Sequence, residues 1–335
     1  MLEAFQAVLQ PMLMLFSCIA IGFVLTKKQI IPTSAASILA KLETWVFVPA
    51  LNFSTMCRFC NIASLSTNIV NLIFGFLSAL IALAITYSIV RLFVREKCYE
   101  QNIYKYGLTF GNFGYASEPL VQAMYGDSVL SYYKIYTMPL TILVFTWGMS
   151  ILVPRNGQKH TPLKSLCNPP TISILLGVVA GFLGLGGESG FLTLHLPFAM
   201  KTLDLLKACM GPVAMLLAGI TIAKFDFVSM FKEKKDYAAT ILRLIVIPVV
   251  LIGLLYGVQQ LCIHTFSFTV PNSILYLAFF AFAVPLGMNT IVYPEAYGGD
   301  AKIGASMAII SDIICIATIP LLFSLMTLLL GAPIW

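Results

Sequence analysis

The stretch GNFGYASEPLVQAMYG, residues 111–126, lies inside a hydrophobic segment that extends from about Asn102 to Gly126. Gly111, Gly114 and Pro119 weaken the hydrogen-bond ladder of a helix here, because glycine is permissive and proline has no N–H. A carboxylate, Glu118, stands beside the proline. In hydrocarbon, interrupted backbone is tolerated only where protein or a wet cavity surrounds it. The stretch therefore predicts a broken membrane helix next to a cavity.

A second segment of this kind lies near Pro285. It reads VPLGMNTIVYPE, residues 284–295, and combines a glycine, two prolines and a buried amide, Asn289. Interrupted spans in both halves of a chain point to the binding site of a transporter. Each half-helix leaves N–H groups unpaired at one end and C=O groups at the other. The positive end suits an anionic substrate and the negative end suits a cation.

Composition places the chain in a membrane. Of its 335 residues, 59% are hydrophobic and only 10% are charged, whereas a soluble domain carries about a quarter charged residues. The basic residues behind the net charge of +6 lie between hydrophobic segments, so they indicate topology rather than nucleic-acid binding. The pair Cys57 and Cys60 has no second pair, and the three histidines lie far apart, so no metal site is expected.

The hydropathy pattern predicts ten spans, each near the ~20 residues that a bilayer requires. Their approximate limits are 4–25, 34–56, 68–93, 102–125, 128–153, 169–186, 197–223, 237–259, 272–297 and 301–330. Thirteen Lys and Arg residues lie in the odd-numbered loops or at the span ends beside them, and only Arg58 lies in an even-numbered loop. This bias predicts an integral protein of the plasma or cytoplasmic membrane, with the odd loops in the cytoplasm and both termini outside.

Five spans per half make the second half enter the membrane from the opposite side, which predicts an inverted repeat. The predicted units are residues 1–153, a cytoplasmic linker at 154–167, and residues 168–335. Pro49 in the second span and Pro212 in the seventh occupy comparable places. Chance is the alternative explanation for such matches, because prolines are common in membrane helices.

Charged residues inside the predicted spans form a second set of candidates, because charge is costly in the membrane and functional by default. We single out Lys41, Glu43, Glu118, Lys134, Lys201, Asp204, Lys207, Arg243, Glu295 and Asp312. Lys41 and Glu43 are within reach of an interface, where snorkelling suffices. The three that open the seventh span can pair along one helix face. We interpret Arg243 as an interface anchor, whereas Lys134 is equally compatible with pointing outward or inward.

Glu118 lies near the middle of its span and adjoins the break, and Asp312 lies about a dozen residues into the tenth span. One interpretation is that protonated or hydrogen-bonded carboxyls fix the packing of helices, with Lys134 or Arg243 as a partner. The other is that they bind a proton or a sodium ion. Both interpretations stay open at the level of sequence.

The residues also match a known family. The chain resembles the auxin efflux carriers, or PIN-like permeases, and most closely their short prokaryotic members. The resemblance covers almost the whole chain and rests on Val48–Phe53 in the second helix, Gly111–Gly126 in the fourth, Asn168–Gly177 in the sixth, Gly211–Gly219 in the seventh and Arg243 with Pro248 in the eighth.

The resemblance implies ten helices in two inverted five-helix repeats. Helices one, two, six and seven would form a scaffold domain, and helices three to five and eight to ten a transport domain. The broken helices four and nine would cross beside the substrate. Asn112 and Pro119 match the binding and crossover positions of the fourth helix, and Pro285 matches the first proline of the ninth. Asn52 falls where the plant carriers have a serine near the substrate carboxylate.

Two departures from the plant carriers bear on substrate and coupling. Thr290 stands where those carriers have their second crossover proline, and Glu118 replaces an apolar residue. These departures leave the substrate open and permit ion coupling.

Together these features predict a secondary transporter of a small organic anion that works by elevator-like alternating access. The predicted substrate-binding residues are Asn52, Asn112, Glu118, Pro119, Pro285, Asn289 and Thr290, and the predicted ion-coupling residues are Glu118 and Asp312. The alternatives are a sodium- or proton-coupled symporter or antiporter of related architecture and, more remotely, an intramembrane enzyme, whose HExxH or GxSxG motifs are missing. No cofactor besides H⁺ or Na⁺ is expected. The expected partners are an organic acid and the lipid bilayer, without nucleic acid; a homodimer is left open.

Overall fold

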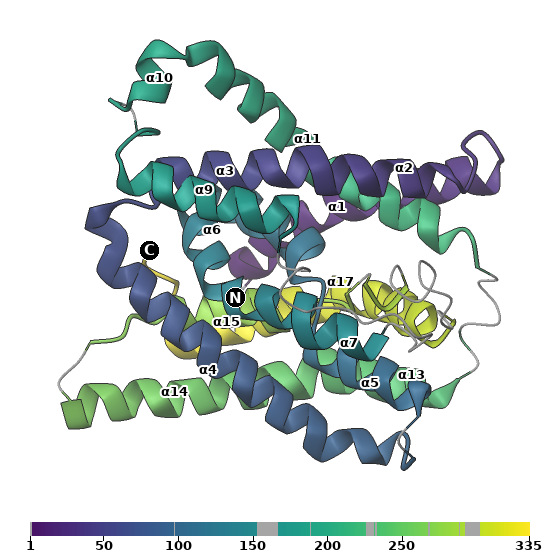
Figure 1. Ribbon diagram of the computed structural model, residues 1–335. Coiled ribbons are helices and arrows are strands. Elements are labelled where there is room, and N and C mark those ends of the chain that lie inside the picture. The colour runs from purple at the N-terminus through teal and green to yellow at the C-terminus, as the bar shows by residue number, and fades with distance from the viewer. Residues whose placement is uncertain are drawn as a thin grey trace.

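The computed structural model is a bundle of helices that run side by side (Figure 1). It describes residues 2–96, 98–152, 167–187, 189–225, 231, 233–266, 269–287, 289–291 and 302–335. All regular secondary structure in these ranges is helical. The predicted linker at 154–167 lies almost entirely outside them, and so does Glu295. The prediction of an all-helical membrane protein is confirmed at this level.

Six of the described helical segments are long and apolar enough to cross a membrane. They are Phe5–Lys27, Ile62–Leu92, Phe113–Leu152, Pro197–Ile222, Lys234–Thr265 and Lys302–Leu330, and two shorter apolar helices are Pro169–Phe182 and Ser273–Phe282. The count of ten spans and the repeat stay predictions.

The segment Phe113–Leu152 doubles back on itself. At 40 residues it would extend about 60 Å as one straight helix, twice the thickness of the hydrocarbon core. Gly126 interrupts it with a φ of 78°, a backbone conformation that glycine adopts without strain. The Tyr133 hydroxyl then donates to the carbonyl oxygen of Phe113 at 3.0 Å, a contact that a straight helix would forbid.

The first half of the chain contains these helices, with η marking π- or 3₁₀-helical turns: α1 Leu2–Lys27, α2 Ala35–Leu42, η1 Glu43–Phe47, α3 Val48–Phe59, η2 Ile62–Ser64, α4 Leu65–Ile89, η3 Val90–Leu92, α5 Tyr99–Thr109, η4 Phe113–Ser117, α6 Glu118–Leu143, η5 Val144–Gly148 and α7 Met149–Leu152. The second half contains α9 Pro169–Phe182, α10 Phe191–His195, α11 Pro197–Ile222, α13 Lys234–Ile241, η6 Leu242–Val246, α14 Ile247–Phe266, α15 Ser273–Phe282 and α17 Lys302–Leu330.

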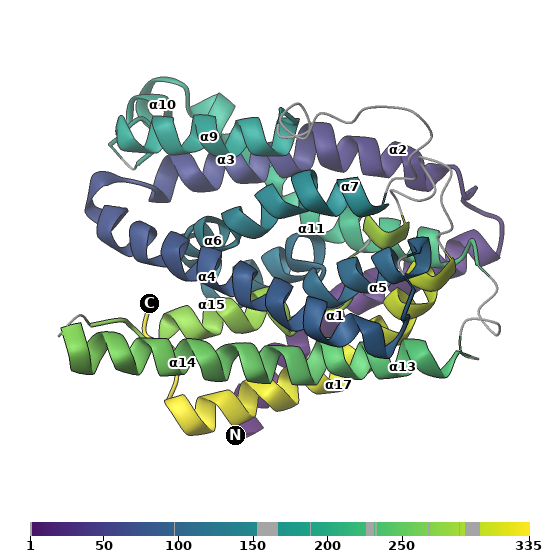
Figure 2. The same cartoon turned by 60° about the horizontal axis from the view of Figure 1, so that its bottom comes forward.

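Two helix pairs pack closely because glycines remove side chains from their contacts. A Cβ on Gly219 of α11 would lie 2.0 Å from the carbonyl oxygen of Ile19 on α1. A Cβ on Gly181 of α9 would lie 2.2 Å from the carbonyl oxygen of Cys60, directly after α3. Close approach of this kind is how membrane helices associate without a hydrophobic driving force. Figure 2 keeps α3 and α9 side by side in a second view.

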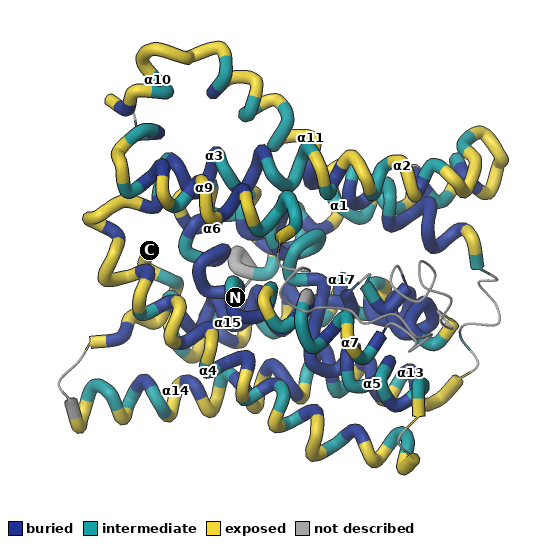
Figure 3. Tube along the Cα trace, in the orientation of Figure 1, coloured by how far each residue is buried: buried dark blue, intermediate teal, exposed yellow. Residues whose placement is uncertain are grey.

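Burial follows the layering of the bundle. Figure 3 places buried residues in the middle and exposed residues on the helices at the periphery. Large apolar side chains such as Leu72 on α4 and Val249 on α14 are exposed. Every residue of α15 from Ile274 to Phe282 is buried. The outer apolar surface suits lipid, and α15 lies at the centre.

Two interrupted helices meet at one point, which we call the helix crossing (Phe110–Asn112 and Ala283–Gly287). Helix α5 ends at Thr109, and helix resumes at Phe113. Helix α15 ends at Phe282, and helical residues resume at 289. Gly111 and Leu286 form an isolated antiparallel β-bridge between the interruptions.

The expected position of the first break is corrected by the structure. It lies at Phe110–Asn112, whereas Pro119 lies in the first turn of α6. Proline is tolerated there because a first-turn N–H has no helical partner to lose. In the second break, Pro285 to Gly287 are outside helix and Thr290 is helical, whereas Met288 and residues 292–301 are outside the described ranges.

Candidate functional site

A cavity of about 540 Å³ lies beside the helix crossing. Four of the predicted binding residues line it: Asn52, Asn112, Glu118 and Asn289. The lining also includes residues of the helix crossing, Gly111 and Gly287, and of the first turn of η4, Phe113 to Tyr115. Residues from other parts of the chain complete it, among them Asn168, Met215 and Thr221. The cavity is therefore built where the two interrupted helices face α3, α9 and α11.

The other three predicted binding residues do not line this cavity. Pro119 packs against Gly211, whose added Cβ would lie 3.2 Å from the Cβ of Pro119. Pro285 belongs to the helix crossing, and its carbonyl oxygen accepts the backbone N–H of Asn112 at 2.7 Å. Thr290 is fully buried, and its hydroxyl donates to the carbonyl oxygen of Gly287 at 2.9 Å. These three residues therefore contribute to packing at and next to the helix crossing and not to the cavity wall.

Asn112 caps the resumed helix at the cavity wall. Its carbonyl oxygen accepts from the N–H groups of Ala116 and Ser117 at 3.0 and 3.3 Å. No described residue engages its side-chain amide, which borders both the cavity and a smaller pocket. The N–H groups of the first turn, Phe113 to Tyr115, have no partner within a helix. This end of the half-helix carries partial positive charge at the cavity.

A buried ion pair lies next to the cavity, and its carboxylate partner, Glu118, lines the wall. The Lys134 ammonium is 2.6 Å from Glu118 Oε2 and 2.6 Å from the Asn52 side-chain oxygen. The exposed fraction is 1% for the Lys134 side chain and 12% for the Glu118 side chain. The Asn52 amide nitrogen in turn donates to the carbonyl oxygen of Pro170 at 2.9 Å. Lys134 thus points inward, and Glu118 has the fixed partner that the packing interpretation requires.

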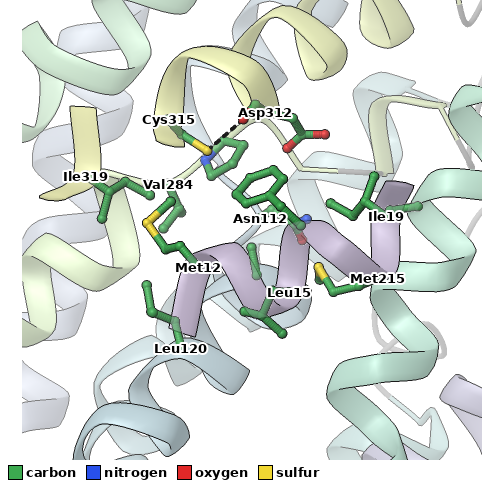
Figure 4. A pocket seen from close by; sticks show the side chains of 14 residues that line it. Met12, Leu15, Ile19, Asn112, Leu120, Met215, Val284, Asp312, Cys315 and Ile319 are labelled. Carbon is green, nitrogen blue, oxygen red and sulfur yellow. Dashed lines mark hydrogen bonds between the residues drawn. The ribbon is translucent and has the colours of Figure 1, made fainter. Parts of the chain in front are cut away.

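Asp312 and Asn112 both border a second, smaller pocket of about 30 Å³ (Figure 4). This volume holds about two water molecules. Among the described residues, the Asp312 carboxylate has neither an ion-pair nor a hydrogen-bond partner. Its neighbour Ser311 accepts a hydrogen bond from the backbone N–H of Leu286 at 2.9 Å, which ties α17 to the helix crossing.

A chain of ion pairs joins α3, α11 and α6 away from the cavity. Arg58 is 2.9 Å from Asp204, and Lys207 is 3.3 Å from Asp204 and 2.5 Å from Asp127. The predicted pairing along the seventh span is confirmed for Asp204 and Lys207. Arg58 and Asp127 come from distant parts of the sequence, and no spacing in the sequence pointed to them.

The structure corrects the interface interpretation of Glu43 and Arg243. Both residues are 0% exposed, and neither carboxylate nor guanidinium has a hydrogen-bond partner in the described ranges. Each lies in a π-helical turn, Glu43 in η1 and Arg243 in η6. Such turns are frequent at functional sites, but their positions depend on tertiary packing. The burial of these two residues could therefore not be predicted from residue type alone.

No cluster of His, Cys, Asp or Glu suited to a metal ion occurs within the described part of the chain. The site consists of amides, helix ends, one ion pair and one unpaired carboxylate. This arrangement offers recognition of a small polar solute at the meeting point of two broken helices, which is the organisation of a membrane transporter.

The comparison with known families agrees with this class. A family model described as "Membrane transport protein" matches residues 7–323 of the chain. The chain belongs to this family, that of the auxin efflux carriers and PIN-like permeases. A search of curated proteins gave no match. Family membership and the six apolar helices identify an integral membrane transport protein, which fits a non-enzymatic role.

Proposed function

We propose that the chain is a secondary transporter of a small organic anion. The observation that carries this proposal is the 540 Å³ cavity at the helix crossing, into which the first turn of the resumed helix brings Phe113, Gly114 and Tyr115. Free N–H groups at a helix N-terminus attract carboxylates. The apolar remainder of the wall, including Met215 and Ile174, suits the body of an organic acid.

The side chains at the cavity take different roles in this proposal. The Asn112 amide, which no described residue engages, binds the solute directly. The Asn289 amide nitrogen donates to the Tyr106 hydroxyl at 2.9 Å, so its oxygen faces a solute hydroxyl or ammonium. The amide nitrogen and the amide oxygen of Asn52 are both already hydrogen-bonded within the protein, so Asn52 acts by holding Lys134 next to Glu118. That buried pair leaves the wall without net charge, so the helix end supplies the attraction for the anion.

Alternating access by an elevator-like motion is the mechanism that we propose. Under the predicted topology, Thr44, Thr141, Asn168 and Thr221 lie in the cytoplasmic halves of their helices, and all four line the cavity. The Arg58–Asp204–Lys207–Asp127 chain lies toward the opposite ends. The arrangement fits a cavity open to the cytoplasm and closed outside by ion pairs between α11 of the scaffold and α6 of the transport domain. In this arrangement the protein lies in the plasma or cytoplasmic membrane, and both of its termini are on the outer side.

A second candidate function is ion-coupled transport through Asp312. The observation that favours it is the place of this unpaired carboxylate, in a small pocket that it shares with Asn112 and Pro285. An ionised carboxylate without a partner is costly in a membrane interior, so a proton or a bound cation would neutralise it. Exchange of that ion as the site changes sides would couple ion flux to solute flux. Glu118 is the weaker coupling candidate because Lys134 already neutralises it.

The first experiment is a thermal-shift screen of organic acids against the purified protein, followed by uptake of the best hit into proteoliposomes. A ligand that binds the folded state raises the melting temperature by mass action. Asn112→Ala should lower the affinity for the acid about tenfold or more, because a hydrogen bond to a charged group contributes about 1.5–3 kcal/mol. Asn71→Ala is the matched control, since Asn71 is buried in α4 away from both pockets. Unchanged affinity and uptake in Asn112→Ala would refute the site.

A further inference from the structure

Arg243 is a buried charged residue to which the proposed transport mechanism assigns no role. It is 0% exposed, and all three of its guanidinium nitrogens lack a hydrogen-bond partner among the described residues. It lines neither the 540 Å³ cavity nor the smaller pocket at Asp312. A permanently charged side chain in a membrane interior needs compensation from its surroundings.

The surroundings of the guanidinium are the ends of two helices. A Cβ on Gly111 would lie only 2.1 Å from Arg243 Nη2 and 3.1 Å from Arg243 Cζ, so the guanidinium packs directly on the backbone of Gly111. The ring of Phe282 lies 5.8 Å from Arg243 Cζ. Gly111 follows the end of α5 at Thr109, and Phe282 is the last residue of α15. Arg243 therefore lies where both first half-helices end.

Both of these ends carry partial negative charge. The last carbonyl groups of a helix have no partner within it, and their dipoles sum to roughly half a negative charge. On α15, the carbonyl oxygen of Phe280 already accepts from Ser117 at 2.6 Å and from Tyr133 at 3.3 Å. These neutral donors satisfy a hydrogen bond but add no positive charge. The C-terminal ends of broken helices in transporters hold sodium or a proton for this electrostatic reason.

We propose that Arg243 is a built-in cation of the helix crossing. Its guanidinium supplies, beside the ends of α5 and α15, the positive charge that a bound sodium ion would otherwise supply. The partial negative charge of the two helix ends is then neutralised throughout the transport cycle, and the protein needs no sodium. This inference rests on the proposed transport function and narrows it, because any coupling ion at Asp312 is then a proton.

The test is the melting temperature of the purified full chain in sodium, potassium or choline chloride at equal ionic strength. The wild type should melt at the same temperature in all three salts. Arg243→Met keeps an apolar stem but removes the charge, so it should melt several degrees lower in choline. Sodium or added guanidinium should restore part of this loss. Arg243→Lys keeps a positive charge and should remain insensitive to sodium. Arg91→Met, at an exposed arginine in η3, should behave as the wild type.

Two results would overturn the proposal. One is a specific rise of the wild-type melting temperature with sodium, and the other is an Arg243→Met variant that is as stable as the wild type and insensitive to cations. If Arg243→Met does not fold, the Arg243→Lys variant provides the test of the proposal. A folded, sodium-insensitive lysine variant supports the proposal, and one that fails to fold or responds to sodium overturns it. Because melting is measured without solute, the outcome does not depend on whether the transported anion has been found.

Discussion

The backbone N–H of Asn112 donates a hydrogen bond to the carbonyl oxygen of Pro285 at 2.7 Å. With the bridge between Gly111 and Leu286, this bond joins the interruptions of two helices from opposite halves of the chain. A backbone group freed from its helix must find a partner inside a membrane. Each interruption supplies hydrogen-bond partners to the other, so the helix crossing behaves as a single unit. A change in one of the two interrupted segments therefore disturbs both helices.

Gly111→Ala should damage the helix crossing. The added Cβ would lie 2.8 Å from Cγ2 of Val284, a stiff β-branched side chain, and 2.1 Å from the buried guanidinium of Arg243. Overpacking of this kind costs about 1–3 kcal/mol, and we expect a lower melting temperature together with reduced solute binding. Gly253→Ala is the matched control, because a Cβ there meets no atom within 4 Å. Equal melting temperatures for the two variants would contradict the close approach of Gly111 and Arg243.

Lys134→Met should be strongly destabilising. It leaves the carboxylate of Glu118, 2.6 Å away in the wild type, without its cation in a largely buried place. Breaking a buried ion pair from one side costs about 3–5 kcal/mol. The double variant Lys134→Met with Glu118→Gln should recover much of this loss, because no uncompensated charge remains. A double-mutant cycle on melting temperatures measures the coupling, and purely additive losses would show that the pair does not act as a unit.

Asp312→Asn should fold normally but lose any dependence of uptake on a pH gradient. The two side chains are nearly isosteric, and the amide cannot release a proton. Uptake into proteoliposomes with and without an imposed pH gradient measures the effect. Asp236→Asn is the control, since this buried carboxylate on α13 accepts from the Tyr104 hydroxyl at 2.8 Å and borders neither pocket. Gradient dependence that survives in Asp312→Asn, or that the wild type lacks, would remove Asp312 from the mechanism.

Lys207→Met should favour opening of the cavity to the outside, where the Arg58–Asp204–Lys207–Asp127 chain of ion pairs is proposed to close it. It removes the ammonium that lies 2.5 Å from Asp127 and 3.3 Å from Asp204. If the pair contributes about 1 kcal/mol, the ratio of open to closed molecules rises about fivefold. Hydrogen–deuterium exchange should then increase around Gly126, where α6 turns. The control is Lys235→Met, whose exposed pair with Glu100 spans 3.9 Å. Equal exchange in the two variants would contradict a gating role.

The sequence alone determined the class of the protein and the existence of the two interruptions. Hydropathy is a local property, and a chain that is 59% hydrophobic and 10% charged leaves no soluble alternative. Glycine and proline weaken a helix through their own backbone chemistry, so the segments around Gly111 and Pro285 could be recognised one at a time. The family resemblance singled out Asn52 and Asn112, and polar character inside a span singled out Glu118 and Asn289; all four line the cavity.

Tertiary structure decided where the first break lies and which charges are buried. Pro119 is the stronger helix breaker by residue type, but the helix is interrupted at Phe110–Asn112, where Gly111 meets Leu286 and Arg243. Arg243 and Glu43 look like interface residues from their distance to the predicted span ends, yet both are fully enclosed by other helices. Lys134 finds Glu118 only because α6 doubles back at Gly126. Each of these outcomes depends on contacts between segments far apart in the sequence, which no local pattern encodes.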